Sequence, residues 1–232
     1  MPIKSSSLIH ETALISADAK LDPSVQVGAY SIIKDNAVIG KNVIIGCHCI
    51  IGAEPFDDLT QKQWGVNIKD GAWIGDHVHI QNGVARNTHI DENTSINHGC
   101  YIGHDVKIGQ DCMIGLSVTI SGHSNLGNAV KIGPGSTLNN RSTIGDNAKI
   151  GIGSLVLHPV EKDSVVIGRP ASDIAEQKKI SAMMRELIGH KRKSMPVSTA
   201  APGLAKYKAF LMPVFKLLPK KLQYHIKNMI SR

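Results

Sequence analysis

Aromatic residues are scarce in this chain of 232 residues, which holds only 3 Phe, 2 Trp and 4 Tyr. Four of the nine lie in the last thirty residues, so the rest of the chain must build a core almost without rings. This argues against a sandwich or a helical domain packed around large side chains. Four cysteines make no disulfide framework. No apolar stretch approaches the roughly 20 residues that cross a bilayer, and the polar start predicts no signal peptide. We therefore expect a cytoplasmic protein.

Acidic residues are almost missing from the C-terminal part. Residues 178–232 contain 13 Lys and Arg but one Glu, whereas residues 1–177 contain 13 against 18 Asp and Glu. The net charge of +7 therefore belongs to the tail, and it does not make the protein a nucleic-acid binder. Residues 204–232 alternate apolar clusters with lysines, which suits peripheral contact with the inner face of a membrane; packing against the protein itself is the alternative.

Aliphatic residues recur at every sixth position through most of the chain. One register runs from Ile9 to Ile51, resumes at Ile68, and after a slip continues from Ile90 to Val156. Glycine often follows the aliphatic residue, and a small residue such as Cys100, Cys112 or Ser136 stands two positions before it.

A period of six fits neither a helix, with its spacing of 3.6, nor a half-buried strand, with its spacing of two. It fits a short strand plus a corner, three of which close a triangular coil of eighteen residues. Such coils stack at roughly the 4.8 Å interstrand spacing, and their narrow interior admits Ile, Leu and Val but few rings. We expect the glycines to supply backbone angles that branched residues resist.

The repeat resembles the hexapeptide-repeat, left-handed parallel β-helix family, whose handedness and usual trimeric assembly are implied by the resemblance. The expected fold is all-β, with about 7–8 coils and a C-terminal helical extension. The predicted domains are the β-helix (1–170), a helix (171–193) begun by Ser172 or Asp173, a linker (194–203) and the basic tail (204–232). Most members of this family are acyltransferases.

Two segments interrupt the repeat. Residues 53–67 form a long excursion that contains Phe56, Asp58 and Trp64, which predicts either a functional loop or a loop that fills a groove between subunits. A second slip at residues 84–89 is too short to interpret.

Among 11 histidines, His104 is the strongest candidate for catalysis. It stands two positions after the inward Ile102, so its side chain can leave the coil near a corner, and Asp105 can orient the imidazole. A His–carboxylate pair is what general-base activation of an amine or hydroxyl requires. Cys100 and Cys112 occupy inward positions, which makes a covalent cysteine route unfavourable.

The stretch Ile102-Gly103-His104-Asp105, followed by Gly122 and His123, is similar to the catalytic region of the UDP-N-acetylglucosamine O-acyltransferases of lipid A synthesis. The resemblance implies that His104 is the general base, that Asp105 supports it and that the Gly122 amide binds the thioester carbonyl. It also implies that His123 contacts substrate and that Phe56, Asp58 and Trp64 belong to a loop over the acceptor sugar. Tyr101 and Asn139 depart from this pattern, because that enzyme has histidines there.

Asn97 and the ending Gly168-Arg169-Pro170-Ala171 are similar instead to acetyl-CoA-dependent sugar acetyltransferases, in which such an ending lies beside the CoA adenine. This favours acetyl-CoA as co-substrate, bound by Gly122, Gly168, Arg169 and Pro170. The acceptor would then be a nucleotide-linked sugar used for surface polysaccharides, with Asn97 among its contacts. A thioester of an acyl carrier protein, an acidic partner that could dock on the basic tail, is the alternative donor.

Two other classes of function remain open. γ-Class carbonic anhydrases share this fold, and Asn97-His98-Gly99-Cys100 resembles the setting of one zinc ligand. The partner five residues earlier is Asn93, no ordinary zinc ligand, so we expect no metal. A non-catalytic scaffold is the other alternative.

Overall fold

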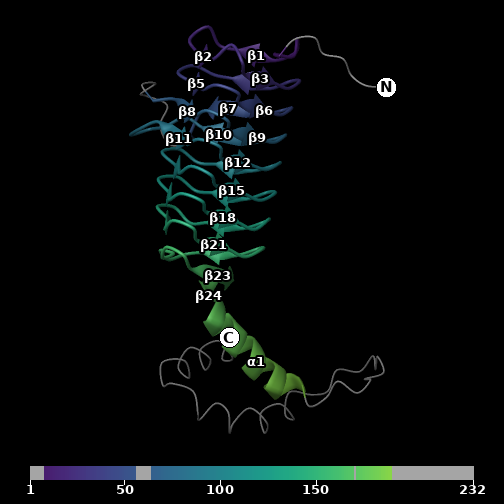
Figure 1. Cartoon of the computed structure of the whole chain (residues 1–232), viewed down its shortest axis with the longest axis vertical. Coiled ribbons are helices and arrows are strands. Elements are labelled where there is room, and N and C mark those ends of the chain that lie inside the picture. The colour runs from purple at the N-terminus through teal and green to yellow at the C-terminus, as the bar shows by residue number, and fades with distance from the viewer. Residues whose placement is uncertain (1–7, 56–63, 170, 190–232) are drawn as a thin grey trace, which may run out of the picture. The chain divides into compact units, whose positions relative to one another are not determined.

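The computed structural model describes residues 8–55, 64–169 and 171–189, and side chains as far as Met184. The chain divides into two compact units, Met1–Met183 and Met184–Arg232. The first unit is a stack of three-sided coils, in which the chain runs repeatedly through three sheets, and the coils follow one another in sequence order (Figure 1).

Each side of the stack is one sheet. The strands of the eight-stranded sheet are β1 (Leu14–Ile15), β4 (Ile32–Ile33), β7 (Ile50–Ala53), β10 (His79–Gln81), β13 (Tyr101–Ile102), β16 (Thr119–Ile120), β19 (Thr137–Leu138) and β22 (Leu155–Val156). Those of the seven-stranded sheet are β2 (Lys20–Leu21), β5 (Val38–Ile39), β8 (Val66–Ile68), β11 (Thr88–Ile90), β14 (Lys107–Ile108), β17 (Asn125–Leu126) and β20 (Thr143–Ile144). Those of the nine-stranded sheet are β3 (Gln26–Val27), β6 (Ile44–Ile45), β9 (Trp73–Ile74), β12 (Ser95–Ile96), β15 (Met113–Ile114), β18 (Lys131–Ile132), β21 (Lys149–Ile150), β23 (Val165–Gly168) and β24 (Ala171–Asp173).

The strands pair in parallel with their equivalents in the next coil. Ile102 of β13 pairs with Ile120 of β16, and Ile120 pairs with Leu138 of β19, so the register advances by eighteen residues a coil. This confirms the triangular coil predicted from the repeat of six.

The interior consists of the two residue columns that the sequence singled out. Most of the large aliphatic residues of the repeat are completely buried, and the small residues two positions earlier are buried beside them. Polar members of the small column are satisfied by backbone carbonyls: Ser136 Oγ donates to Gly151 O at 2.9 Å, and Cys100 Sγ donates to Gly115 O at 3.0 Å. The prediction of a narrow core without rings is therefore confirmed.

Gly52 has the positive φ expected of a repeat glycine, 90°, but most glycines of the repeat have a different purpose. Gly103 and Gly109 do not adopt a positive φ; that conformation falls two residues later, at Asp105 and Asp111. A Cβ at Gly103 would lie 2.6 Å from Gly122 N, and one at Gly109 would lie 2.5 Å from the carbonyl oxygen of the next coil. Glycine is needed there because adjacent coils approach too closely for any side chain.

The coil period is broken twice, both times at one corner. Ile51 and Ile68 are seventeen positions apart, and Ile80 and Ile90 are ten apart, where the regular spacing is six. Both insertions connect a strand of the eight-stranded sheet to the following strand of the seven-stranded sheet.

The stack ends in an antiparallel pair, β23 with β24, followed by helix α1 (Ile174–Gly189). Residues 171–173, predicted as the start of the helix, form β24, and Asp173 caps the helix by accepting the Ala175 N–H at 2.8 Å. The predicted linker (194–203) and basic tail (204–232) lie outside the described residues. No helix in the described part of the chain has the length and apolar character needed to span a bilayer.

Neighbouring positions on β14 should differ sharply in their effect on stability. Ile108 is fully buried in the core column, whereas Lys107 points to solvent. We expect Ile108→Ala to lower the free energy of unfolding by about 2–5 kcal/mol and Lys107→Ala to change it by less than about 0.5 kcal/mol. Urea unfolding followed by circular dichroism measures both, and similar losses for the two variants would contradict the alternating register.

Candidate functional site

Four of the predicted site residues meet at the corner that carries the two insertions. His104 and Asp105 follow β13, and Gly122 and His123 follow β16 one coil later. The imidazoles of His104 and His123 lie edge to face with ring centroids 4.8 Å apart. The structure therefore brings the predicted base, its carboxylate and two residues predicted to contact the substrates into one cluster.

Asp105 is held by the short insertion. Its carboxylate is completely buried, and its backbone has a φ of 58°, in the left-handed region. Three successive amides of the insertion donate to Oδ1: Val84 N at 3.1 Å, Ala85 N at 2.9 Å and Arg86 N at 2.8 Å. Such a run of N–H groups forms an anion-binding nest, which explains how an ionised carboxylate is accommodated inside the protein.

Two further side chains fix the backbone of Asp105. Thr88 Oγ1 accepts its N–H at 3.0 Å, and the Arg86 guanidinium donates to its carbonyl from Nε at 3.0 Å and from Nη2 at 2.7 Å. Gln81 Oε1 accepts the His104 N–H at 3.1 Å. The four additional residues of this coil therefore build the support of the His–Asp pair.

The second carboxylate oxygen faces both imidazoles. Asp105 Oδ2 lies 2.8 Å from His104 Nδ1 and 3.5 Å from His123 Nδ1. Because an ionised carboxylate only accepts, the short contact places the proton of neutral His104 on Nδ1 and leaves the lone pair of Nε2 open. The His104 side chain is 21% exposed, so this nitrogen belongs to a ring that solvent reaches.

The acidity of Asp105 reflects the balance of these contacts. Burial alone would raise the pKa of its carboxyl group, but hydrogen bonds from His104 and from the amides of Arg86, Ala85 and Val84 outweigh burial and lower the pKa below the usual value. Asp105 is therefore ionised at neutral pH.

Gly122 lies directly against the base. A Cβ built on it would stand 2.6 Å from His104 Nε2, so no side chain fits there without moving the imidazole. Its amide donates to no described residue, whereas the corner amides of Gln110 and Asn128 donate to Asn128 Oδ1 and Asp146 Oδ1. A backbone donor without a protein acceptor beside a base is suited to hold a reacting carbonyl oxygen.

Other predicted site residues do not join this cluster within one chain. Asn97 follows β12 and Gly168 ends β23, both in the nine-stranded sheet, so that these residues and Arg169 lie at or near another corner. Phe56, Asp58 and Pro170 lie outside the described residues. Trp64, which is 39% exposed, stands at the end of the long insertion, at the same corner as His104 but toward the N-terminal coils.

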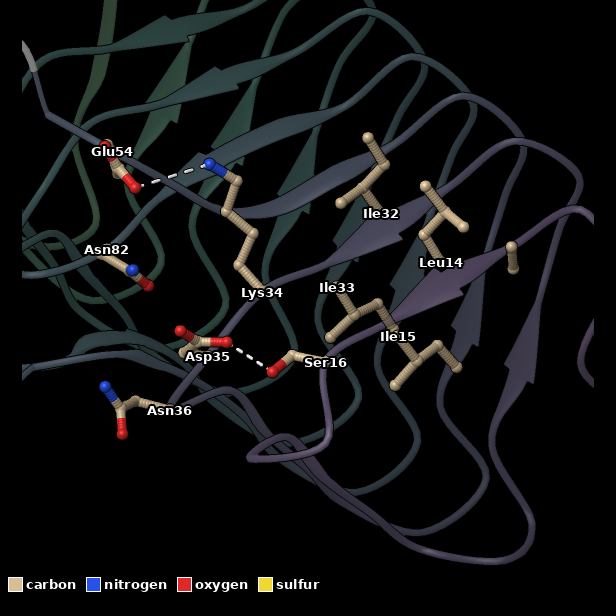
Figure 2. A pocket seen from close by; sticks show the side chains of 11 residues that line it. Leu14, Ile15, Ser16, Ile32, Ile33, Lys34, Asp35, Asn36, Glu54 and Asn82 are labelled. Atoms are coloured by element: carbon tan, nitrogen blue, oxygen red, sulfur yellow. Dashed lines mark hydrogen bonds and ion pairs between the residues drawn. The ribbon is translucent and has the colours of Figure 1, made fainter.

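A hollow of about 620 Å³ lies along the His104 corner in the first four coils, and it is not lined by His104 or Asp105. Figure 2 shows its polar side, where Lys34 reaches Glu54 at 3.7 Å and Ser16 bonds to Asp35, with Asn82 beside them. Asn82 Oδ1 is buried without a hydrogen-bond partner. The hollow adjoins the long insertion, because Glu54 belongs to that insertion and lines the hollow.

The cysteines do not offer a nucleophile at this site. Cys100 and Cys112 are buried, as predicted, and burial raises the pKa of both thiols. Cys49 is buried in the same way, whereas Cys47 is partly exposed.

The residues that resemble a carbonic anhydrase zinc site do not form a ligand cluster, and the side chains that could hold a metal ion lie elsewhere. His98 Nδ1 accepts the Asp76 N–H at 2.8 Å, and Asn93 lies at a different corner of the coil. Among the described residues, the only group of three or more His, Cys, Asp or Glu with suitably close ligand atoms is His104, Asp105 and His123.

Sequence reasoning missed the residues that support the His104–Asp105 pair, namely Gln81, Thr88 and the run Val84–Arg86. The break in the repeat at residues 84–89 could have indicated them, because additional residues in a regular coil mark a corner whose shape differs from the others.

Comparison with known proteins supports this description of the fold. The model of the bacterial transferase hexapeptide family (six repeats) matches residues 18–53 and 87–122. The chain has the fold of a left-handed parallel β-helix.

Solved structures of the same left-handed β-helix include the UDP-N-acetylglucosamine O-acyltransferase of Moraxella catarrhalis RH4. It is 23% identical, with a TM-score of 0.64, over 91% of this chain and 95% of that one. The Arabidopsis UDP-N-acetylglucosamine acyltransferase is 19% identical, with a TM-score of 0.54, over 95% and 90%. Comparison with curated protein sequences gives no match.

Replacing the buried carboxylate should change the pH dependence of stability. The folded-state pKa of Asp105 is lowered, so its stabilisation is complete above the ordinary aspartate pKa of about 3.9 and is lost as pH falls through the lower folded value. We expect Asp105→Asn to cost about 2 kcal/mol near pH 7 and the difference from wild type to shrink below about pH 4.

The matched control is Asp111→Asn, at the equivalent corner position after the next strand, because Asp111 has a φ of 56° but is exposed. We expect it to change stability by less than about 0.5 kcal/mol. Urea titrations at several pH values measure both variants, and a constant difference between wild type and Asp105→Asn across this range would contradict the lowered pKa.

Proposed function

We propose that the protein is an acyltransferase that moves an acetyl group from acetyl-CoA to an amino or hydroxyl group of a nucleotide-linked sugar. The observation that carries the proposal is the His104 imidazole, oriented by a buried carboxylate through Nδ1 and placed against Gly122, whose amide donates to no described residue. General-base catalysis of acyl transfer needs these two elements, a base with a free lone pair and a donor for the oxyanion.

In the proposed mechanism, His104 Nε2 removes a proton from the acceptor as its nitrogen or oxygen attacks the thioester carbonyl. The Gly122 N–H stabilises the tetrahedral oxyanion, an interaction typically worth about 3–4 kcal/mol. The C–S bond then breaks, the thiolate leaves, and the imidazolium returns the proton to it. Asp105 keeps the ring in one tautomer and stabilises the imidazolium in between.

The acceptor would be held by His123 and by the long insertion at the same corner, with Phe56, Asp58 and Trp64 as its contacts. The structural neighbours bear the name of enzymes that acylate UDP-N-acetylglucosamine, which supports a nucleotide-sugar acceptor for this chain. Asn97, Gly168 and Arg169 lie at another corner, so only a neighbouring copy could bring them to His104. We therefore propose a homotrimer with its sites between protomers.

The donor has two candidates. Acetyl-CoA is favoured by the resemblance of Gly168-Arg169-Pro170-Ala171 to the endings of acetyl-CoA-dependent enzymes. A thioester of an acyl carrier protein is the second, because residues 178–232 carry 13 Lys and Arg against one acidic residue and could attract an acidic carrier. Both donors and nucleotide sugars occur in the cytoplasm, where we place the protein.

Removing the base should abolish transfer without unfolding the protein. We expect His104→Ala to lower the turnover number by about 10²–10⁴ while the protein stays folded and donor binding stays close to wild type. The matched control is His98→Ala, because His98 Nδ1 also lies near a carboxylate oxygen, 3.3 Å from that of Asp76, but at another corner. It should retain transfer.

Mass spectrometry of products from a panel of UDP-, dTDP- and GDP-linked sugars measures transfer, with acetyl-CoA and acyl carrier protein thioesters as separate donor arms. Equal turnover of His104→Ala and wild type would remove His104 from catalysis. Absence of transfer from either donor to every sugar of the panel would contradict the proposed function.

A further inference from the structure

We propose that His104, Asp105 and His123 form a binding site for a divalent transition-metal ion of the zinc class, and that the bound ion switches off the base. The binding follows from the geometry of the three side chains. The switching rests on the proposed function, because it concerns the catalytic nitrogen. No metal was expected from the sequence.

The three side chains offer a ligand set that zinc prefers. One ligand atom from each of them lies within 4.8 Å of the other two. Asp105 Oδ2 is 2.8 Å from His104 Nδ1 and 3.5 Å from His123 Nδ1. Ligands at the usual zinc distances of about 2.0–2.2 Å stand roughly 3.3 Å apart in a tetrahedral site, and both His–Asp separations lie within about 0.5 Å of that value.

The surroundings of Asp105 support a ligand role for its carboxylate. Oδ1 is occupied by the amides of Val84, Ala85 and Arg86, which leaves Oδ2 to face the two imidazoles. Carboxylate ligands in metal sites are held by hydrogen bonds of this kind, which fix their orientation. The carboxylate therefore has one oxygen that is free to serve as a ligand between the two rings.

The site is open to ions from solvent. The side chain of His104 is 21% exposed and that of His123 is 32% exposed, while Asp105 beneath them is fully buried. Two histidines and one carboxylate leave a fourth tetrahedral position for water, as in zinc sites with three protein ligands.

Metal binding and base catalysis exclude each other at His104. In the metal-free protein the ring proton is on Nδ1, bonded to Asp105, and Nε2 has the free lone pair. An ion on Nδ1 needs that lone pair, so the proton moves to Nε2, and the ring keeps its single proton and its neutral charge. Nε2 is then a donor and can no longer accept a proton from the acceptor substrate.

The experiment is a titration of the metal-free, untagged full-length protein with Co²⁺, followed by visible absorption. We expect one ion per chain with the bands of four-coordinate cobalt, and stoichiometric Zn²⁺ should displace it. His123→Gln should raise the dissociation constant at least tenfold, and Asp105→Asn should do the same. The matched control is His98→Gln, from the other His–Asp pair, which should bind as wild type does.

Two results would overturn the metal site: wild-type protein without four-coordinate bands, or unchanged affinity in His123→Gln. The His123→Gln variant is the decisive one, because Asp105 is buried and its replacement also affects folding. Acyl transfer is assayed separately, with chelator and with one equivalent of Zn²⁺. Activity in chelator that zinc abolishes supports the switch, and activity that survives zinc in the cobalt-binding protein contradicts it. Inactivity in chelator contradicts the proposed transferase, while the titration still decides the metal site.

Discussion

The dominant constraint on this molecule is that each coil must bring every residue next to the residue eighteen positions earlier in the chain. Parallel pairing between coils, such as Ile102 with Ile120, is possible only when this spacing is kept, and the pairing in turn stacks the aliphatic column. The interior is then so narrow that Ile, Val, Ser and Cys fill it. Close approach of successive coils explains why glycine stands at Gly103 and Gly109.

The candidate site occurs where this constraint is relaxed. The connection between β10 and β11 has four additional residues, and three amides of this insertion donate to the carboxylate of Asp105. The register of eighteen residues then places Gly122 next to His104 and His123 next to Asp105, and the rings of His104 and His123 both face one oxygen of that carboxylate. A repetitive scaffold thus gives precise spacing, and a single irregularity adds the buried charge that orients the proposed base.

The sequence predicted the regular part of the structure well, because a repeat of six gives both the strands and the buried columns directly. It also identified His104 and Asp105, which are adjacent in sequence and therefore need no tertiary information to be paired. The nest around Asp105 was not predicted, because Val84 and Arg86 stand about twenty residues earlier and meet it only when coils stack. The role of the glycines was misjudged for the same reason: the clash at Gly109 is with Gly127, in the next coil. Asn97 and His104 are separated because they lie at different corners of the coil. These corners are identified once the strands are assigned to sheets.

The central claim is that Asp105 holds the proton of His104 on Nδ1 and leaves Nε2 free to act as a base. Nitrogen-15 NMR of histidine-labelled protein, treated with chelator and assigned with the His104→Ala variant, measures this directly. Above the pH at which the ring loses its charge, the account predicts a protonated Nδ1 and an unprotonated Nε2 for His104. A His104 ring with its proton on Nε2, the tautomer that free histidine favours in water, would contradict it.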